Sequence, residues 1–258
     1  MSKNIFLWGA GWLGLPLAKS ISESSNNVSC ITRSREKKNF LISHSLNATT
    51  IDELVHEPQV LIKCDVFIIT VPPVAEFSFN ESISFFLKFL PQYCHVIYTS
   101  STGIYKNSDG LKDENSEIDS IKGVFQIEDF LQKQKRQNLT ILRLGGLIGP
   151  KRHPVHFLAK KTVNENPNQV VNLVQQIDII KVVLFFIERK KSGIFNVCSP
   201  EHPTRKEYYT LAAKAFGLSS LSFENDEHQS GKIVDTKKLV DLIPDLTFNS
   251  IYDFERCQ

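Results

Sequence analysis

Three glycines near the start of the chain, Gly9, Gly11 and Gly14, follow the spacing G-x-G-x-x-G. An apolar run from Ile5 to Trp8 precedes them, and residues 13–21 carry the apolar spacing of a helix. At a turn from strand to helix, this spacing serves a tight bend, close approach of the backbone to a pyrophosphate, and close packing of helix on strand. Amides at the helix N-terminus would hold the anion. The pattern predicts dinucleotide binding, and the alternative is a glycine turn that binds nothing.

The predicted second strand ends in the segment Thr32-Arg33-Ser34-Arg35. An acidic residue at this place would hydrogen-bond the ribose of NAD, whereas this segment offers hydroxyls and arginines. Because Arg33 suits a 2′-phosphate, the sequence favours NADP over NAD. The alternative is that Arg33 and Arg35 begin the basic face of the next helix, and Arg35 fits that alternative better.

Three further predicted strands end in segments suited to a cofactor. The fourth ends in Thr70-Val71-Pro72-Pro73, where proline must turn the chain out of the sheet. The fifth ends in hydroxyls (99–102) that can hydrogen-bond groups under a nicotinamide, although such residues are also common in turns. The sixth leads to Gly145 and Gly146, which allow close backbone approach to a ligand or simply form a loop. The residues that we expect to contact the cofactor are Gly9, Gly11, Trp12, Leu13, Gly14, Thr32, Arg33, Ser34, Val71, Pro72, Pro73, Ser100, Gly145 and Gly146.

Charged and imidazole side chains follow the sixth predicted strand, at Arg152, His153 and His156. Pro154 breaks the helical geometry that a histidine pair would need, and no third ligand is near in the sequence, so we expect no metal site. Arg152 and His153, together with Thr102, are instead expected to line a substrate pocket.

Short apolar segments alternate with helical ones through the first 150 residues. We expect strands at 4–8, 28–32, 48–50, 66–70, 95–99 and 140–144, and helices at 13–22, 34–45, 81–90 and 124–134. Such alternation produces right-handed crossovers and a parallel sheet with helices on both faces. The predicted fold class is α/β, a Rossmann-type doubly wound parallel sheet, which binds ligands at the carboxyl ends of its strands.

The regular alternation of short apolar segments with helical segments ends after Pro150. Helices are expected at 155–163, 177–188 and 206–216, the last capped by Thr204 and closed by Gly217, and strands at 170–173 and 193–197. No flexible linker separates the two halves. We therefore expect residues 1–150 to form an NAD(P)-binding Rossmann domain, and residues 151–258 to form a small substrate lobe packed on it and partly interleaved with it.

The composition fits a globular chain with a sizeable core. The 258 residues are 41% hydrophobic, and the net charge of +2 is too small to imply a nucleic-acid partner. The five cysteines form no C-x-x-C pair, which predicts buried thiols in a reducing compartment. Glycines and Pro16 interrupt the N-terminal apolar run, so we expect a cytoplasmic protein, and no segment reaches the length of a membrane span.

Taken together, these segments resemble the extended short-chain dehydrogenases/reductases, the NAD-dependent epimerase/dehydratase family. The glycine pattern, the segment 100–105 and the segment 142–150 carry the match, which spans nearly the whole chain. The resemblance is closest to an atypical bacterial subgroup of YeeZ type. Counterparts of that subgroup are the segments 12–18, 152–154, 171–172 and 195–197.

In that family, a serine or threonine after the fifth strand works with a Tyr-x-x-x-Lys pair on the following helix. Ser101 lies four residues before Tyr105, where the resemblance places the catalytic serine. Aligning Glu128 with the acidic residue that follows the pair puts Ser120 and Val124 at the tyrosine and lysine positions. The pair is therefore expected to be missing, since serine and valine cannot replace a tyrosine activated by lysine.

Other residues are candidates for moving the proton. Tyr105, Lys122 and His153 are each considered, although Tyr105 does not align with the catalytic tyrosine, and Lys122 also suits a solvated helix start. The expected catalytic set is Ser101, Tyr105 and Lys122.

The resemblance implies an NAD(P)-dependent oxidoreductase or epimerase/dehydratase acting on a small polar, sugar-derived substrate, with NADP preferred to NAD. The missing pair favours an alternative, a non-catalytic NADP-binding sensor or regulatory protein that binds a partner. A homodimer through the helices near 79–90 and 124–134 is also implied, with neither nucleic acid nor membrane as a partner.

Overall fold

The computed structural model describes residues 2–72, 79–159, 166–223 and 230–258. The chain forms two compact units, which alternate along the sequence. Unit 1 comprises Met1–Ser100, Ser120–Leu142 and Ile180–Ile194, and unit 2 comprises Ser101–Asp119, Arg143–Ile179 and Phe195–Gln258. The division at residue 150 that the sequence favours stays a prediction.

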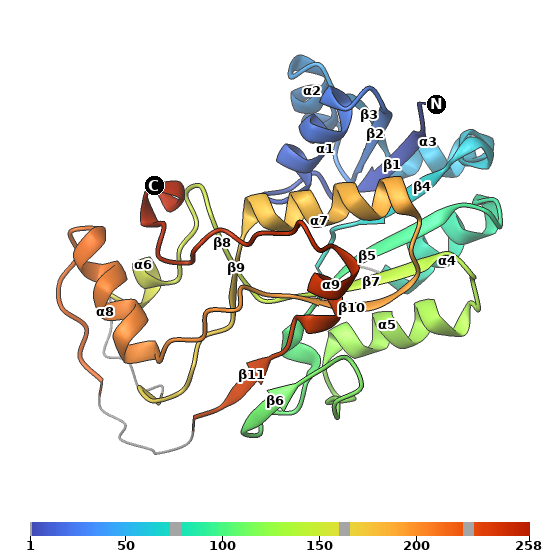
Figure 1. Ribbon diagram of the computed structural model, residues 1–258. Coiled ribbons are helices and arrows are strands. Elements are labelled where there is room, and N and C mark those ends of the chain that lie inside the picture. Colours follow the sequence, from blue (N-terminus) through green and yellow to red (C-terminus); the bar gives the residue numbers. More distant parts are fainter. Residues whose placement is uncertain (1, 73–78, 160–165, 224–229) are drawn as a thin grey trace. The chain divides into compact units, whose positions relative to one another are not determined.

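Among the described residues, a seven-stranded sheet runs in the order β10-β7-β5-β4-β1-β2-β3 (Figure 1). Its strands are β1 (Asn4–Trp8), β2 (Asn27–Thr32), β3 (Asn47–Thr50), β4 (Val66–Ile69), β5 (His95–Ser101), β7 (Leu139–Leu144) and β10 (Gly193–Val197). Strand β1 pairs in parallel with both β2 and β4. The strand order therefore reverses beside β1, which is where open α/β sheets bind ligands.

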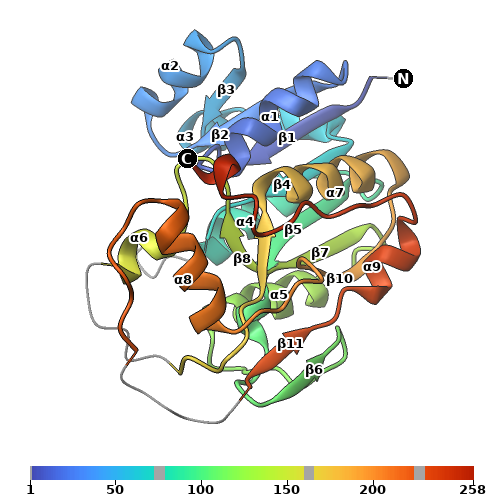
Figure 2. The same ribbon diagram turned by 60° about the vertical axis from the view of Figure 1, so that its left-hand side comes forward.

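Helices pack on both faces of the sheet in unit 1. Trp8, Phe67 and Tyr98 share a core cluster with side chains of α3, α4 and α5. Leu7 alternates with Trp8 along β1 and so faces the opposite side, and α1 packs against β1 and β2. Figures 1 and 2 show α1 and α2 beside β1, β2 and β3. The helices with residues in this unit are α1 (Gly14–Glu23), α2 (Arg35–Ser43), α3 (Ile51–His56), the 3-10 helix η1 (Pro58–Lys63), α4 (Phe79–Phe89), α5 (Gly123–Lys133) and α7 (Gln176–Arg189).

Unit 2 holds two small parallel sheets and a separate core. Strand β6 (Gly110–Lys112) pairs with β11 (Lys232–Val234), and β8 (Gly146–Ile148) pairs with β9 (Leu173–Gln175). The core joins side chains of α6 (Val155–Leu158) and α8 (Arg205–Ala215) with the C-terminal segment. Its remaining helices are η2 (Thr102–Ile104), α9 (Lys237–Leu242) and η3 (Phe254–Cys257).

The predicted α/β fold with a doubly wound parallel sheet is confirmed. Strands 4–8 and 193–197 have the predicted bounds, and all five cysteines are buried free thiols. The strand expected at 170–173 is instead β9 at Leu173–Gln175, because Val170 makes only an isolated bridge to Thr204. Part of the helix expected at 155–163 lies outside the described residues. Across the described part of the chain, no helix has the length and apolar character that crossing a membrane requires.

Candidate functional site

The glycine turn lies between β1 and α1 and uses each glycine differently. Gly9 has a φ of +111°, a conformation that side chains rarely allow. A Cβ on Gly14 would lie 2.0 Å from the carbonyl oxygen of Gly9, so only glycine lets α1 start this close to β1. Among the described residues, and apart from its two chain neighbours, a Cβ on Gly11 would in contrast meet no heavy atom within 4 Å. Bend and packing thus explain Gly9 and Gly14, and open space remains beside Gly11.

The N-terminus of α1 faces this space without a capping side chain. Leu13 is its N-cap residue and makes no side-chain cap hydrogen bond, and the first turn contains no acidic residue. The first amides of a helix need acceptors, and the helix dipole favours an anion there. A pyrophosphate beside Gly11 would satisfy both needs, so the residues present fit the phosphates of a dinucleotide.

The carboxyl end of β4 packs directly on this turn. Thr70 Oγ1 donates a 2.6 Å hydrogen bond to the carbonyl oxygen of Gly9. Val71 is half-buried, and its Cγ2 atom would lie 2.9 Å from a Cβ on Gly9, whereas Pro72 is exposed. Pro73, also expected at the cofactor, lies outside the described residues. The prolines are the signal in the sequence for this strand end, whereas Thr70 makes the direct contact with the glycine turn.

The end of β2 lies beside the same turn, since the amide of Gly9 donates to the carbonyl of Ile31 at 3.2 Å. Thr32 is half-buried and Arg33 is exposed. Ser34 is the N-cap of α2, and its hydroxyl accepts a hydrogen bond from the amide of Lys37 at 3.2 Å. Ser34 therefore has a structural task, and Arg33 is an exposed cation directly after β2.

At the end of β5, Ser100 faces α5 in unit 1. Its hydroxyl donates to Oε1 of Glu128 at 2.5 Å, and both residues are buried. This bond connects the strand to the helix through a buried carboxylate. On the same helix, Val124 is half-buried, while Ser120 lies exposed before its start.

Lys122 precedes α5 as its N-cap residue, in an extended conformation and with no side-chain cap hydrogen bond. It is half-buried. Its assignment to the catalytic set stays a prediction.

In unit 2, Ser101 caps the short helix η2. Its Oγ accepts a hydrogen bond from the amide of Gly103 at 3.0 Å. This bond uses a lone pair of the oxygen and leaves the hydroxyl hydrogen for another acceptor. Ser101 is half-buried, and Thr102, expected in the substrate pocket, is buried. Ser101 is thus held in one orientation with a hydrogen to donate.

Tyr105 lies in a buried polar network of unit 2. Its hydroxyl donates to Oδ1 of Asn196 at 2.6 Å and accepts from a guanidinium nitrogen of Arg143 at 3.1 Å. The amide of Asn196 in turn donates to the Glu114 carboxylate at 2.7 Å. Burial raises the pKa of Tyr105, with Arg143 opposing the shift. A fully buried phenol with both hydrogen-bonding roles occupied suits anchoring better than proton transfer.

The other predicted residues of unit 2 also make internal contacts. A Cβ on Gly145 would lie 2.9 Å from the carbonyl oxygen of Asn172, and one on Gly146 would lie 2.7 Å from the Leu173 side chain. Close packing of β8 on β9 accounts for these two glycines, and contact with a cofactor stays a prediction for both.

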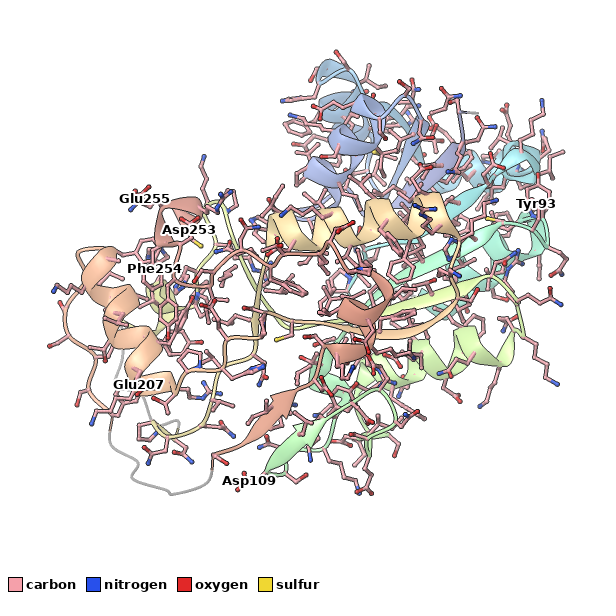
Figure 3. All side chains as sticks on the ribbon, in the orientation of Figure 1. Tyr93, Asp109, Glu207, Asp253, Phe254 and Glu255 are labelled. Carbon is pink, nitrogen blue, oxygen red and sulfur yellow. The ribbon has the colours of Figure 1, made fainter. Side chains whose placement is uncertain are left out.

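His153 is enclosed by aromatic side chains rather than open to solvent. It is 1% exposed, and its ring centroid lies 5.1 Å from that of Phe216 and 5.7 Å from that of Phe254, which Figure 3 labels beside the C-terminal turn. Its Nδ1 accepts from the Val155 amide, and its Nε2 pairs with the Tyr208 hydroxyl at 2.9 Å. Burial lowers its pKa to about 4. Arg152, by contrast, is exposed.

Metal ligands and surface depressions are the remaining features that bear on ligand binding. Within the described ranges, no three histidine, cysteine or acidic side chains gather in a way that could hold a metal ion. A surface depression of about 550 Å³ in unit 1 is lined by Phe6, Ile42, Asn47 and Val60, among others. It lies along β3 and the neighbouring helices, apart from the glycine turn.

Comparisons with known proteins bear on the family and the fold of the chain. No family model matches the sequence. Protein YeeZ of Escherichia coli strain K12 is 30% identical over 261 residues, covering 92% of this chain and 93% of YeeZ. The fold resembles that of WbmH, a Bordetella bronchiseptica enzyme solved with NAD+, with a TM-score of 0.78 at 14% identity over 100% of this chain and 97% of WbmH. It also resembles UDP-N-acetylglucosamine 4-epimerase of Bacillus cereus, with a TM-score of 0.70 at 18% identity over 99% of this chain and 96% of that one.

Proposed function

Because the chain belongs to the same family as YeeZ, a branch of the NAD-dependent epimerase/dehydratase group of short-chain dehydrogenases/reductases, we propose that it binds a nicotinamide dinucleotide at the glycine turn. The observation that carries this proposal is the contrast among the three glycines. Gly9 and Gly14 are required by bend and packing, whereas no described residue apart from its chain neighbours lies within 4 Å of a Cβ on Gly11. A turn with only a structural task has no need for glycine at that position.

A Gly11→Ala variant tests the binding site. The added methyl group meets no atom of the described residues beyond its chain neighbours within 4 Å, so the free energy of unfolding should stay within about 0.5 kcal/mol of the wild type. It would stand where the pyrophosphate approaches, so affinity for NADPH and NADH should fall roughly tenfold or more. Titration followed by tryptophan fluorescence measures the affinity, and urea unfolding measures the stability. If the wild type binds the cofactor and Gly11→Ala binds it equally tightly, the cofactor does not bind at this turn.

We further propose that the preferred cofactor is NADP. Arg33 is exposed at the end of β2, and the segment 32–35 has no carboxylate to bind a ribose 2′-hydroxyl. The Arg33→Ala variant should lose NADPH affinity roughly tenfold, about 1.4 kcal/mol, and change NADH affinity little. Arg35→Ala is the matched control, because Arg35 is the first residue of α2. Equal losses for NADPH and NADH would contradict recognition of the 2′-phosphate.

For the chemistry, we propose an epimerase- or reductase-type reaction on a sugar nucleotide, with Ser101 as the hydroxyl that contacts the substrate. When bound, the nicotinamide ring supplies the site that accepts or returns a hydride. The support is the orientation of Ser101, whose hydroxyl hydrogen is not used by its bond to Gly103. Purified protein incubated with NADP or NAD and a panel of UDP-sugars should change nicotinamide absorbance or the sugar epimer. Ser101→Ala should lower that rate roughly 100-fold, and Ser43→Ala, on the exposed end of α2, should not change it.

The second candidate function is a non-catalytic NADP-binding protein that responds to the redox state of the cofactor. The enclosed hydroxyl of Tyr105 favours it, because this side chain is then not available to replace the Tyr-x-x-x-Lys pair. Tight NADPH binding without turnover of any sugar nucleotide, together with different affinities for NADPH and NADP+, would support this function over catalysis.

A further inference from the structure

We infer that Thr70 is a positioning residue for the dinucleotide turn, an inference that rests on the proposed function. Thr70 follows β4 directly, and its backbone amide donates to the carbonyl of Trp8 at 2.9 Å. Its side chain thereby lies against the turn that follows Trp8. The contact joins two neighbouring strands of the sheet at their carboxyl ends, 61 residues apart in sequence.

The carbonyl oxygen of Gly9 is the atom through which Thr70 acts. It accepts from Thr70 Oγ1 at 2.6 Å and from the amide of Gly11 at 2.9 Å. It also lies 2.0 Å from the place that a Cβ on Gly14 would occupy. Two hydrogen bonds therefore hold the carbonyl of this peptide group, and the close approach of Gly14 leaves it little room to move.

The direction of this peptide determines where the following amides point. Gly9 has a positive φ, so its carbonyl could otherwise rotate with little steric resistance. Rotation would release the amide of Gly11 and shift the start of α1, whose first amides are the expected anion donors. The Thr70 hydroxyl resists that rotation with a bond at the short end of the range for O–H···O geometry. Preorganisation of this kind increases affinity without any contact between Thr70 and the ligand.

Two substitutions separate the role of the Thr70 hydroxyl from that of its methyl group. Thr70→Ser keeps the donor and should bind NADPH within about twofold of the wild type, whereas Thr70→Ala removes it and should bind roughly five- to tenfold more weakly. Thr140→Ala is the matched control. Thr140 is the second residue of β7 in unit 1, away from the carboxyl ends of the strands; it is buried, and its hydroxyl donates to the backbone carbonyl of Lys191.

The experiment combines NADPH titration with amide hydrogen exchange of residues 10–15 in the ligand-free protein and with urea unfolding. A purely structural role would lower the unfolding free energy of Thr70→Ala and Thr140→Ala alike and leave the affinity for NADPH unchanged. The positioning role is supported if only Thr70→Ala loses affinity and exchanges faster in this segment, and if Thr70→Ser restores both. Equal affinities and equal exchange for the two alanine variants would overturn it. If the wild type binds neither NADPH nor NADH, the proposed function fails, and the exchange comparison alone decides whether Thr70 fixes the turn.

Discussion

The hydroxyl of Tyr105 donates a 2.6 Å hydrogen bond to Oδ1 of Asn196, 91 residues further along the chain. The side-chain amide of Asn196 then donates to the backbone carbonyls of Lys112 and Asp235. One pair of side chains thereby joins the segment after β5 to β6, β10 and the segment after β11 (Figure 2). The tyrosine that the sequence offers as a proton donor has a demanding structural task, and its variants should be assessed by stability before activity.

Replacing Tyr105 by phenylalanine should lower the free energy of unfolding by about 1–3 kcal/mol. The change leaves Oδ1 of Asn196 and a guanidinium N–H of Arg143 without this partner in a buried place, and unsatisfied buried groups carry the full desolvation cost. Urea unfolding at pH 7.5 measures the loss. Tyr93→Phe is the control, since Tyr93 in unit 1, labelled in Figure 3, is 53% exposed, and this variant should change stability by less than about 0.5 kcal/mol. A Tyr105→Phe protein as stable as the wild type would refute the anchoring role.

Replacing Gly14 by alanine should be far more damaging than the same change at Gly11. The new Cβ of Gly14→Ala would lie 2.0 Å from the Gly9 carbonyl oxygen, a backbone atom that cannot swing aside as a flexible side chain would. We expect a loss of about 3 kcal/mol, at the upper end for overpacking. Thermal unfolding of both variants measures the difference. Similar melting temperatures for the two would mean that α1 can slide away from β1 at little cost.

The stability of the protein should decrease as the pH falls from 7 towards 4. Burial, aided by the charge of His156, lowers the pKa of His153 in the folded state from 6.5 to about 4. Between these two pKa values the unfolded chain binds the proton and the folded chain does not, so the contribution is complete above pH 6.5 and declines below it. At pH 5, His153 alone should cost about 2 kcal/mol. Urea unfolding at pH 7.5 and pH 5 tests this.

The control for this pH dependence is His153→Gln. Glutamine cannot titrate, so the variant should lose less stability over the same pH interval, even though it is less stable at pH 7.5. The remaining slope should come in part from His95, whose pKa burial also lowers to about 4. The same slope in wild type and variant would contradict the assignment to His153.

The N-terminus of α8 should depend on its capping box. Thr204 accepts from the Glu207 amide at 3.2 Å, and the Glu207 carboxylate accepts from the Thr204 amide at 3.1 Å. Thr204→Ala should therefore cost about 1 kcal/mol. Thr210→Ala, at an exposed position inside the same helix, should be neutral or slightly stabilising because alanine has the higher helix propensity. A loss at Thr210 as large as that at Thr204 would show that capping is not the cause.

Local patterns in the sequence predict the elements that depend on local rules. Apolar runs bounded by glycine and proline locate the strands of the large sheet, and Thr204 is the N-cap that its spacing indicates. The glycine turn follows the same logic, because bend and packing are properties of a few adjacent residues. Gly9 and Gly14 have the tight geometry that the spacing predicts.

Pairings between distant segments were not predictable in the same way. Strands β6 and β11 are three residues each and pair over more than 100 residues of sequence, so neither has a pattern of its own. The contact of Thr70 with Gly9 depends on β4 lying next to β1, which a strand list without its order does not state. The polarity of His153 in the sequence says nothing about the aromatic side chains that surround it, and its place in a substrate pocket stays a prediction.

The pairing of β6 with β11 also bears on the order in which the protein is made. Asn172 bonds the backbone of Lys232 and Val234, and Asn196 bonds that of Asp235, so these contacts of unit 2 need residues that lie more than 100 positions after β6. They can form only after those later residues have been synthesised. The contacts of Gly9, Gly14 and Thr70, in contrast, lie within the first 70 residues. A nascent chain can thus form its glycine turn before β11, the partner strand of β6, has been synthesised.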